Sequence, residues 1–259
     1  MGIRERVTAR VVDLFSHSER PLRDTEKYNG DTGLFGPGSI SWEVLGDVSS
    51  FVGGIRALLI QAAHPEVAAG VADHSSYRED PLGRLSRTAY YVTSMTYGAM
   101  PEIEQAVSMV NHAHLRVSGI SERGRTYSAS SPQYSAWVHN TLTDSFLQAF
   151  QIFKRPMTPN EADKFVAEQS LIGEKMGADP LPKTAHELKL WINCHPDIGD
   201  SLALREAIAF LKDPPLTRYE SFGYRILQRA AATTIEPPLQ ATLGPVSYTH
   251  LTLPTKRIV

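Results

Sequence analysis

The 259-residue sequence predicts an all-α fold built as a single multi-helix domain. Apolar residues recur at steps of three and four along most of the chain, and prolines with Ser, Thr or Asp caps separate the periodic segments. We find no alternating run of strand length, no internal repeat and no low-complexity segment. The hydrophobic content of 42% is enough for a real core, and the punctuation suggests nine or ten helices.

The first half of the chain predicts four or five of these helices. Residues 3–14 have the spacing of an amphipathic helix, and a polar segment follows over 20–39. Ser41 can cap a long, mostly apolar helix that continues through Ala63, where His64-Pro65 ends or kinks it because proline disfavours helical geometry in the preceding residue. A short helix is expected over residues 65–72.

Two neighbouring helices are expected next, joined by a very short connection. Asp80-Pro81 combines an N-cap with a first-turn proline and opens a helix to about Tyr97. Pro101 opens the following helix, which we expect to end at Gly119. Short connections place helices side by side and antiparallel. A polar linker is expected over 121–130, and further helices over 131–153, from the Thr158–Glu161 capping box, from the Thr184–Glu187 cap, over 200–211 and over 218–234.

Composition excludes several classes of protein. The formal net charge is −2 and there is no long basic run, so no nucleic-acid partner is expected. The single cysteine, Cys194, rules out an intrachain disulfide and fits a reducing compartment, so a cytoplasmic location is expected. No apolar run reaches the ~18 residues of a transmembrane helix. The first residues lack a secretory signal, while peripheral membrane contact through the amphipathic helix stays open.

The C-terminal segment is interpreted separately. From Val246 the chain reads VSYTHLTLPT, which resembles a translated transposase sequencing adapter. We therefore expect a helical domain over residues 1–245 and a non-native tail over 246–259, in which His250 has no functional weight.

The most informative chemical feature is a histidine on an apolar helical stripe. Ile103, Val107, Val110, His114 and Val117 share one face of the predicted helix after Pro101. Because a buried imidazole must form a hydrogen bond, titrate or bind a metal, His114 is the leading candidate ligand. His112 lies on a different face of the same helix.

Arginines supply the second feature. Arg84, Arg87, Thr88, Tyr91 and Met95 share one face of the helix that begins at Pro81, and this face can line a cavity with His114 or simply be solvated. Arg56 lies among aliphatic residues, where a guanidinium needs an anion. Its partner is either Glu66, Asp73 or Asp144, or a bound carboxylate ligand.

The other histidines give weaker signals. His139 lies on a helical stripe and is either a hydrogen-bonded core residue or a ligand-binding group. His64 is interpreted as a charged cap at a helix end, and His17, His186 and His195 as surface residues. His64, His74 and Asp73 could also bind a single metal ion, although the sequence does not fix the geometry of the loop that would bring them together. The zinc-protease, dinucleotide, phosphate-loop and serine-hydrolase motifs are absent.

Five blocks in order resemble the MpaB and rubber oxygenase catalytic-domain family, whose members include latex clearing protein. They are GPGSISWEVLGD (36–47), GGIRALLIQAAHPEVAAGVADHS (53–75), DPLGRLSRT (80–88), HLRVSG (114–119) and VHNTLTDSF (138–146). The resemblance implies a globin-like helical core that holds haem b. It also implies oxidative cleavage of a C=C bond in an apolar isoprenoid- or lipid-like substrate by dioxygen.

The same resemblance assigns roles to individual residues. The proximal haem ligand falls on His114, and the distal R-x-x-[KR]-T motif on Arg84, Arg87 and Thr88. Latex clearing protein has a lysine where this chain has Arg87, and a guanidinium, which stays protonated, is not expected to bind iron. Arg56, as a partner of a haem propionate, and His139 are further cofactor-binding candidates. Glu66 and Asp73 are the only candidates for the family's acidic residue.

Two other functions remain open on the sequence. The same core can bind haem as a gas sensor without turnover. Alternatively, the chain is a cofactor-free helical protein that binds a partner, with His114 as an ordinary core histidine and the arginines as an ion-pair surface.

Overall fold

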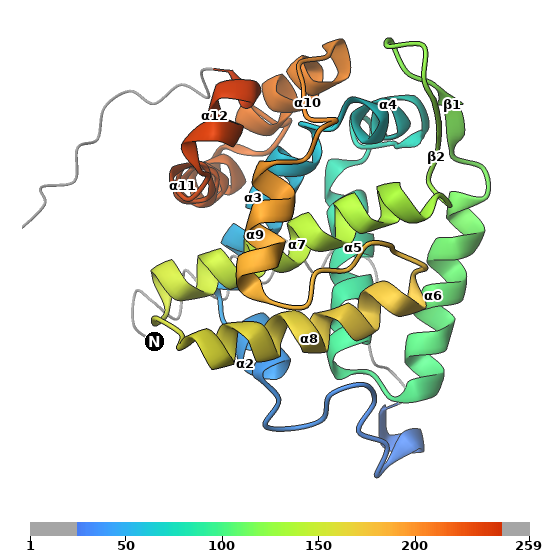
Figure 1. Cartoon of the computed structure of the whole chain (residues 1–259), viewed down its shortest axis with the longest axis vertical. Helices are drawn as coiled ribbons and strands as arrows, with labels where there is room; N and C mark the ends of the chain where they lie inside the picture. Colours follow the sequence, from blue (N-terminus) through green and yellow to red (C-terminus); the bar gives the residue numbers. More distant parts are fainter. Residues whose placement is uncertain (1–24, 245–259) are drawn as a thin grey trace, which may run out of the picture.

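Eleven α-helices and one β-hairpin make up the part of the chain that the computed structural model describes, residues 25–244 (Figure 1). The prediction of a mostly helical domain is confirmed. The expected N-terminal helix and C-terminal tail lie outside the described residues. In chain order the elements are η1 (Thr25–Tyr28), α2 (Ile40–Gly46), α3 (Ser49–Gln61), α4 (Pro65–His74), α5 (Pro81–Tyr97), α6 (Met100–His114), β1 (Ser118–Ile120), β2 (Thr126–Ser128), α7 (Pro132–Phe153), α8 (Pro159–Lys175), α9 (Ala185–Asn193), α10 (Leu202–Lys212), α11 (Arg218–Thr233) and α12 (Pro237–Leu243).

The centre of the molecule is the pairing of α3 with α7, the most extensive contact between two elements. The two helices approach closely at Gly53, where a Cβ atom would stand 2.8 Å from the Phe146 ring and 3.0 Å from the Ser145 carbonyl oxygen. Around this contact lies the main core, whose largest fully buried side chains include Trp137, Phe150 and Leu59.

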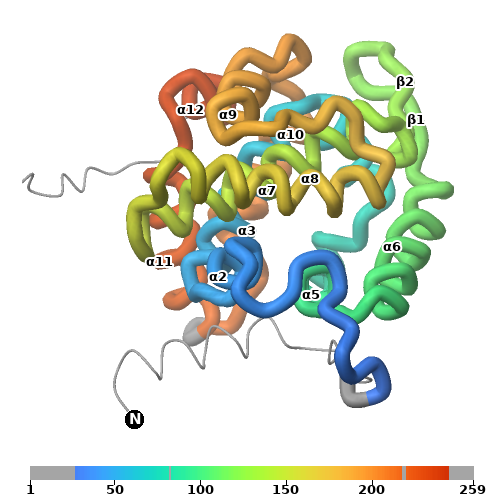
Figure 2. Tube along the Cα trace, turned by 60° about the horizontal axis from the view of Figure 1, so that its bottom comes forward, coloured from blue at the N-terminus to red at the C-terminus, as the bar shows by residue number. Residues whose placement is uncertain are grey.

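A smaller apolar cluster lies at one side of the molecule, between α5, α6 and α8. Met95, Ile103, Ala106 and Ile172 form its buried part. In Figure 1, α5 and α6 run in similar directions and across the direction of α7 and α8, and Figure 2 shows α6 at the edge of the molecule. Among the described elements, α6 makes extensive contact with α5 alone. This arrangement matches the antiparallel pair that the short Gly98-Ala99 connection predicts.

Four local predictions were wrong. The helix expected to be capped by Ser41 is capped by Ser39, whose hydroxyl accepts a hydrogen bond from the Trp42 amide at 3.2 Å. The helix expected over residues 41–63 is two helices, because Asp47 leaves the helical conformation and its carboxylate accepts a hydrogen bond from the Ser49 amide at 2.9 Å. The helix expected to reach Gly119 ends at His114. The linker over 121–130 contains β2, which pairs antiparallel with β1 around a turn at Gly124, where φ is +73°. Strands of three residues are too short to show an alternating pattern.

Within the described residues, no helix is both long enough and apolar enough to span a lipid bilayer.

Candidate functional site

The apolar stripe of α6 becomes less buried along its length. Ile103 is fully buried, whereas Val107, Val110 and His114 are half-buried. Burial nevertheless lowers the pKa of His114. Its imidazole makes no hydrogen bond within the described part of the chain, although its backbone carbonyl accepts one from Val117 at 3.0 Å. His114 is therefore a desolvated imidazole with its ring nitrogens free for a ligand.

The α5–α6 pair brings His114 and Arg84 to the same end of the molecule. Arg84 lies in the first turn of α5, and His114 is the last residue of α6. Because the two helices are antiparallel and joined by two residues, both side chains belong to the ends of α5 and α6 that are remote from the connection. The sequence prediction that these two groups share one region is consistent with this topology.

Arg84 is half-buried and lacks a carboxylate partner among the described residues. Its guanidinium donates to the Ser75 hydroxyl. Burial, followed by the charge of Arg87, lowers the pKa of Arg84. A buried guanidinium without an anion is costly, so Arg84 has capacity to bind an anionic group.

Arg87 and Thr88 are in a different environment, since both are exposed. Arg87 lies 3.4 Å from a carboxylate oxygen of Asp80, and the Thr88 hydroxyl donates back to the Arg84 carbonyl at 3.1 Å. The structure thus supports the expected interior position for Arg84 more strongly than for these two residues.

An open pocket of about 570 Å³ lies along the adjacent face of α6. This volume falls in the range of about 300–1,000 Å³ that small-molecule sites occupy. Neither His114 nor Arg84 is one of its lining residues, whereas His112 is. The lining comprises Glu104, Val107, Ser108, Asn111, His112, Leu115 and, from the end of α8, Lys175.

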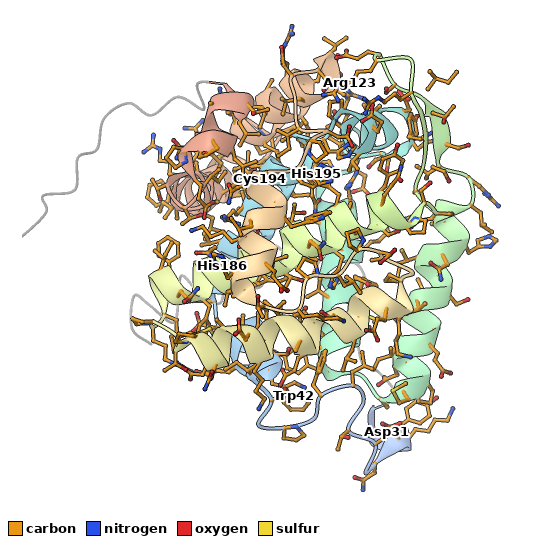
Figure 3. All side chains as sticks on the ribbon, in the orientation of Figure 1. Asp31, Trp42, Arg123, His186, Cys194 and His195 are labelled. Atoms are coloured by element: carbon orange, nitrogen blue, oxygen red, sulfur yellow. The ribbon has the colours of Figure 1, made fainter. Side chains whose placement is uncertain are left out.

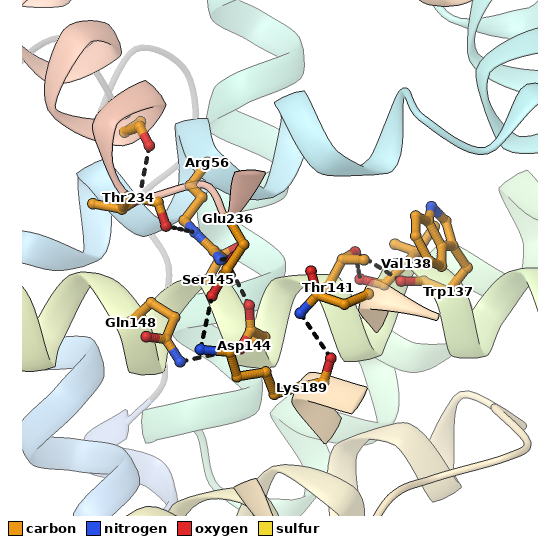
Figure 4. A network of polar contacts seen from close by, with 12 residues as sticks. Arg56, Trp137, Val138, Thr141, Asp144, Ser145, Gln148, Lys189, Thr234 and Glu236 are labelled. Carbon is orange, nitrogen blue, oxygen red and sulfur yellow. Dashed lines mark hydrogen bonds and ion pairs between the residues drawn. The ribbon is translucent and has the colours of Figure 1, made fainter. Parts of the chain in front are cut away.

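Arg56 is fully buried and held by protein groups, which is one of the two alternatives that the sequence left open. Its guanidinium donates to Asp144 at 2.6 Å and to Glu236 at 2.9 Å. The Ser145 hydroxyl at 3.0 Å and the Thr234 carbonyl at 3.4 Å complete the set (Figure 4). This network joins α3, α7 and the α11–α12 connection, and it uses four of the five N–H donors of the guanidinium and supplies two carboxylates.

His139 is half-buried on α7, with its ring against Gly173 of α8. A Cβ atom on Gly173 would stand 3.0 Å from its Nε2, and the Thr143 hydroxyl is 3.4 Å from the same nitrogen. Burial, partly offset by a hydrogen bond to the Gln169 backbone, lowers the pKa of His139 to about 4. The ring is thus neutral at pH 7 and lies in the contact between these two helices.

A second cluster of ionisable groups was not found from the sequence. His64, His195 and Asp197 offer ligand atoms that all lie within 4.8 Å of one another. His195 follows the end of α9 (Figure 3) and was expected on the surface. Asp73 and His74, which the sequence suggested as partners of His64, contact the β-hairpin instead. Asp73 accepts a hydrogen bond from the Tyr127 hydroxyl, and Nε2 of His74 lies 3.1 Å from the Ser118 carbonyl oxygen.

The interpretation of His64 as a charged helix cap was wrong. The ring is 2% exposed, and burial, together with the positive charge of a protonated His195, lowers the pKa of His64 to about 4. It is therefore neutral at pH 7. No motif in the sequence could have paired it with residues about 130 positions away.

Comparison with known proteins gives one match. The model of the family described as ER-bound oxygenase mpaB/B'/Rubber oxygenase, catalytic domain, matches residues 42–255. No curated protein and no solved structure matches the chain.

Proposed function

Since the chain belongs to the catalytic-domain family of ER-bound oxygenases MpaB/B′ and rubber oxygenases, we propose that it is a haem-b-dependent oxygenase. The proposed reaction is oxidative cleavage of a C=C bond by dioxygen in an apolar, isoprenoid- or lipid-like substrate, with carbonyl products. Membership of an oxygenase family supports the reaction class, and the residues of α5 and α6 support the cofactor.

The environment of His114 carries the cofactor proposal. A neutral imidazole at the end of an apolar stripe, without a protein hydrogen-bond partner in the described chain, is suited to be an axial haem ligand. The half-buried valines of the same stripe offer the apolar surface that a porphyrin face requires. His114 and these valines thus have the chemistry that haem b requires of its binding site.

Arg84 supplies the second support. A porphyrin bears two propionates, and Arg84 is the half-buried guanidinium at this end of the α5–α6 pair that lacks a carboxylate partner in the described structure. We therefore transfer the propionate-binding role expected for Arg56 to Arg84, because the donors of Arg56 are used within the core.

When bound, the haem supplies the activation of dioxygen. The protein positions the substrate and excludes water. Met95 and Ile103 form a fully buried apolar contact between α5 and α6. Burial raises the pKa of Tyr91 on the same side of α5, so its phenol stays protonated and remains a hydrogen-bond donor. Such surroundings favour an apolar alkene over a polar substrate.

Haem titration of the purified protein tests the cofactor assignment. We expect a Soret band at one haem per chain and its loss or displacement in His114→Ala. His112→Ala is the matched control, because His112 lies on the same helix, is exposed and lines the neighbouring pocket. An unchanged Soret band in His114→Ala would refute the axial role, and a protein that takes up no haem would favour the cofactor-free alternative.

Turnover is tested by exposing the reduced, haem-loaded protein to dioxygen and a linear polyisoprenoid alkene. Carbonyl-terminated fragments detected by mass spectrometry are the expected products. Haem binding without any such product would favour the gas-sensing alternative.

A further inference from the structure

The cluster of His64, His195 and Asp197 is not part of the α5–α6 pair and lies where two segments of the chain meet. His64 precedes α4, and the other two residues are in the α9–α10 connection. The Gly199 amide donates to the Ala63 carbonyl at 3.0 Å, which fixes these two segments against each other. His64 is thus held by the fold beside a pair of ligand groups from a distant part of the sequence.

His64 has one ring edge against a carboxylate. Its Nδ1 lies 3.3 Å from Oε2 of Glu66, and both atoms are buried and lack a hydrogen bond in the described structure. The other oxygen of Glu66 accepts from the Ser121 hydroxyl at 2.9 Å. A carboxylate beside the remaining nitrogen is the usual second-shell partner of a metal-bound histidine, because it orients the ring and fixes its tautomer.

Asp197 and His195 each use one of their two potential ligand atoms in a contact within the protein, and the other atom can bind a metal ion. Oδ1 of Asp197 binds Arg125, so Oδ2 is available. Nδ1 of His195 accepts a long hydrogen bond of 3.3 Å from the Asp197 amide. Metal binding through Nε2 requires the ring proton on Nδ1, so this long contact would open. Arg125 and Arg123, which also donates to the Asp197 carbonyl at 3.1 Å, place positive charge beside the cluster.

We propose that His64, through Nε2, with His195 and Asp197, binds one divalent transition-metal ion, with Glu66 orienting His64. Two imidazoles and one carboxylate are a donor set for Zn²⁺, Fe²⁺ or Co²⁺ rather than for Mg²⁺ or Ca²⁺, which prefer oxygen ligands. Three protein ligands leave coordination positions open. The inference goes beyond the proposed oxygenase function and does not depend on haem.

Bound metal would join the start of α4 to the α9–α10 connection. The positive charges of Arg123 and Arg125 repel a divalent cation and so weaken metal binding. Removing one of these charges is therefore expected to strengthen it.

The test is calorimetric titration of tag-free, chelator-treated and haem-free full chain with Zn²⁺, and titration with Co²⁺ followed by absorbance. We expect one ion per chain. His195→Phe, which keeps an aromatic ring against Trp137 and Trp191, and Asp197→Asn should each weaken binding at least tenfold. Glu66→Gln should weaken it by about 10–100-fold.

His186→Phe is the matched control, because His186 is an exposed histidine on α9 outside the cluster. Arg125→Gln should tighten binding, since it removes a cation and frees an Asp197 oxygen. Circular dichroism in chelator checks that each variant is folded. Wild-type protein that binds less than one ion per chain would overturn the proposal, and so would His195→Phe and Asp197→Asn variants that bind like wild type.

Discussion

Nη1 of Arg56 on α3 lies 2.6 Å from Oδ2 of Asp144 on α7, and both side chains are almost fully buried. The pair stands at the centre of the most extensive helix contact of the described structure, and Glu236 extends it toward α12. Removing one partner of a buried pair leaves an uncompensated charge, which makes this contact decisive for folding.

We expect Arg56→Met to lower the free energy of unfolding by about 3–5 kcal/mol, because it leaves Asp144 buried without its cation. Urea unfolding followed by circular dichroism measures the change. The double variant Arg56→Met/Asp144→Leu should regain part of the loss. A single variant within 1 kcal/mol of wild type would contradict this interpretation.

Gly53 and Gly54 provide a pair of neighbouring substitutions with opposite expected signs. Gly53→Ala should destabilise by roughly 1–3 kcal/mol, because its Cβ atom would press on the α7 backbone at 3.0 Å. A Cβ atom on Gly54 meets nothing within 4 Å, so Gly54→Ala should stabilise α3 by about 0.5–1 kcal/mol. Thermal unfolding of both variants checks the signs. Equal effects would show that α3 and α7 are not in this close contact.

Stability should fall as the pH decreases from about 6.5 to about 4. The pKa of His139 is lowered from 6.5 to about 4 in the folded protein, so the unfolded chain binds the proton more readily in this window. The contribution of His139 to this loss is on the order of 3 kcal/mol at most, and His64, whose pKa is also about 4, adds to it in the same pH window. Unfolding of haem-free protein at several pH values measures the slope, which His139→Gln should reduce. An identical slope in the variant would contradict the assignment.

Arg84→Gln should weaken the uptake of haem but not of haem dimethyl ester, whose esterified propionates carry no charge. The reason is that the Arg84 guanidinium has no carboxylate partner among the described residues. Arg87→Gln is the control, because Arg87 is exposed and lies beside Asp80. Affinities come from Soret titrations. Equal weakening with both porphyrins would show that Arg84 acts through packing instead.

The sequence predicted best what depends on local chemistry. The capping boxes at Thr158–Glu161 and Thr184–Glu187 both form, with the hydroxyl accepting from the amide three residues later. It failed where distant segments decide the outcome. His195 becomes part of a cluster only because the fold brings it to His64, and among three candidate acids only the structure selects Asp144 for Arg56.

The stripe on α6 shows the same division. Periodicity placed Ile103, Val107, Val110 and His114 on one face, and the structure has them there, but only Ile103 is fully buried. Sequence patterns report which face is apolar, and they do not report how much of that face the rest of the protein covers. The incomplete cover of His114 is what makes it a candidate ligand.

Because α6 packs chiefly against α5, these two helices should form a separate cooperative unit that unfolds locally before the rest of the molecule. Their amide protons should exchange faster than those of α3 and α7 in the apoprotein. A prosthetic group bound tightly between them would slow this exchange by mass action. Binding of the cofactor would thus itself stabilise the two helices that form its site.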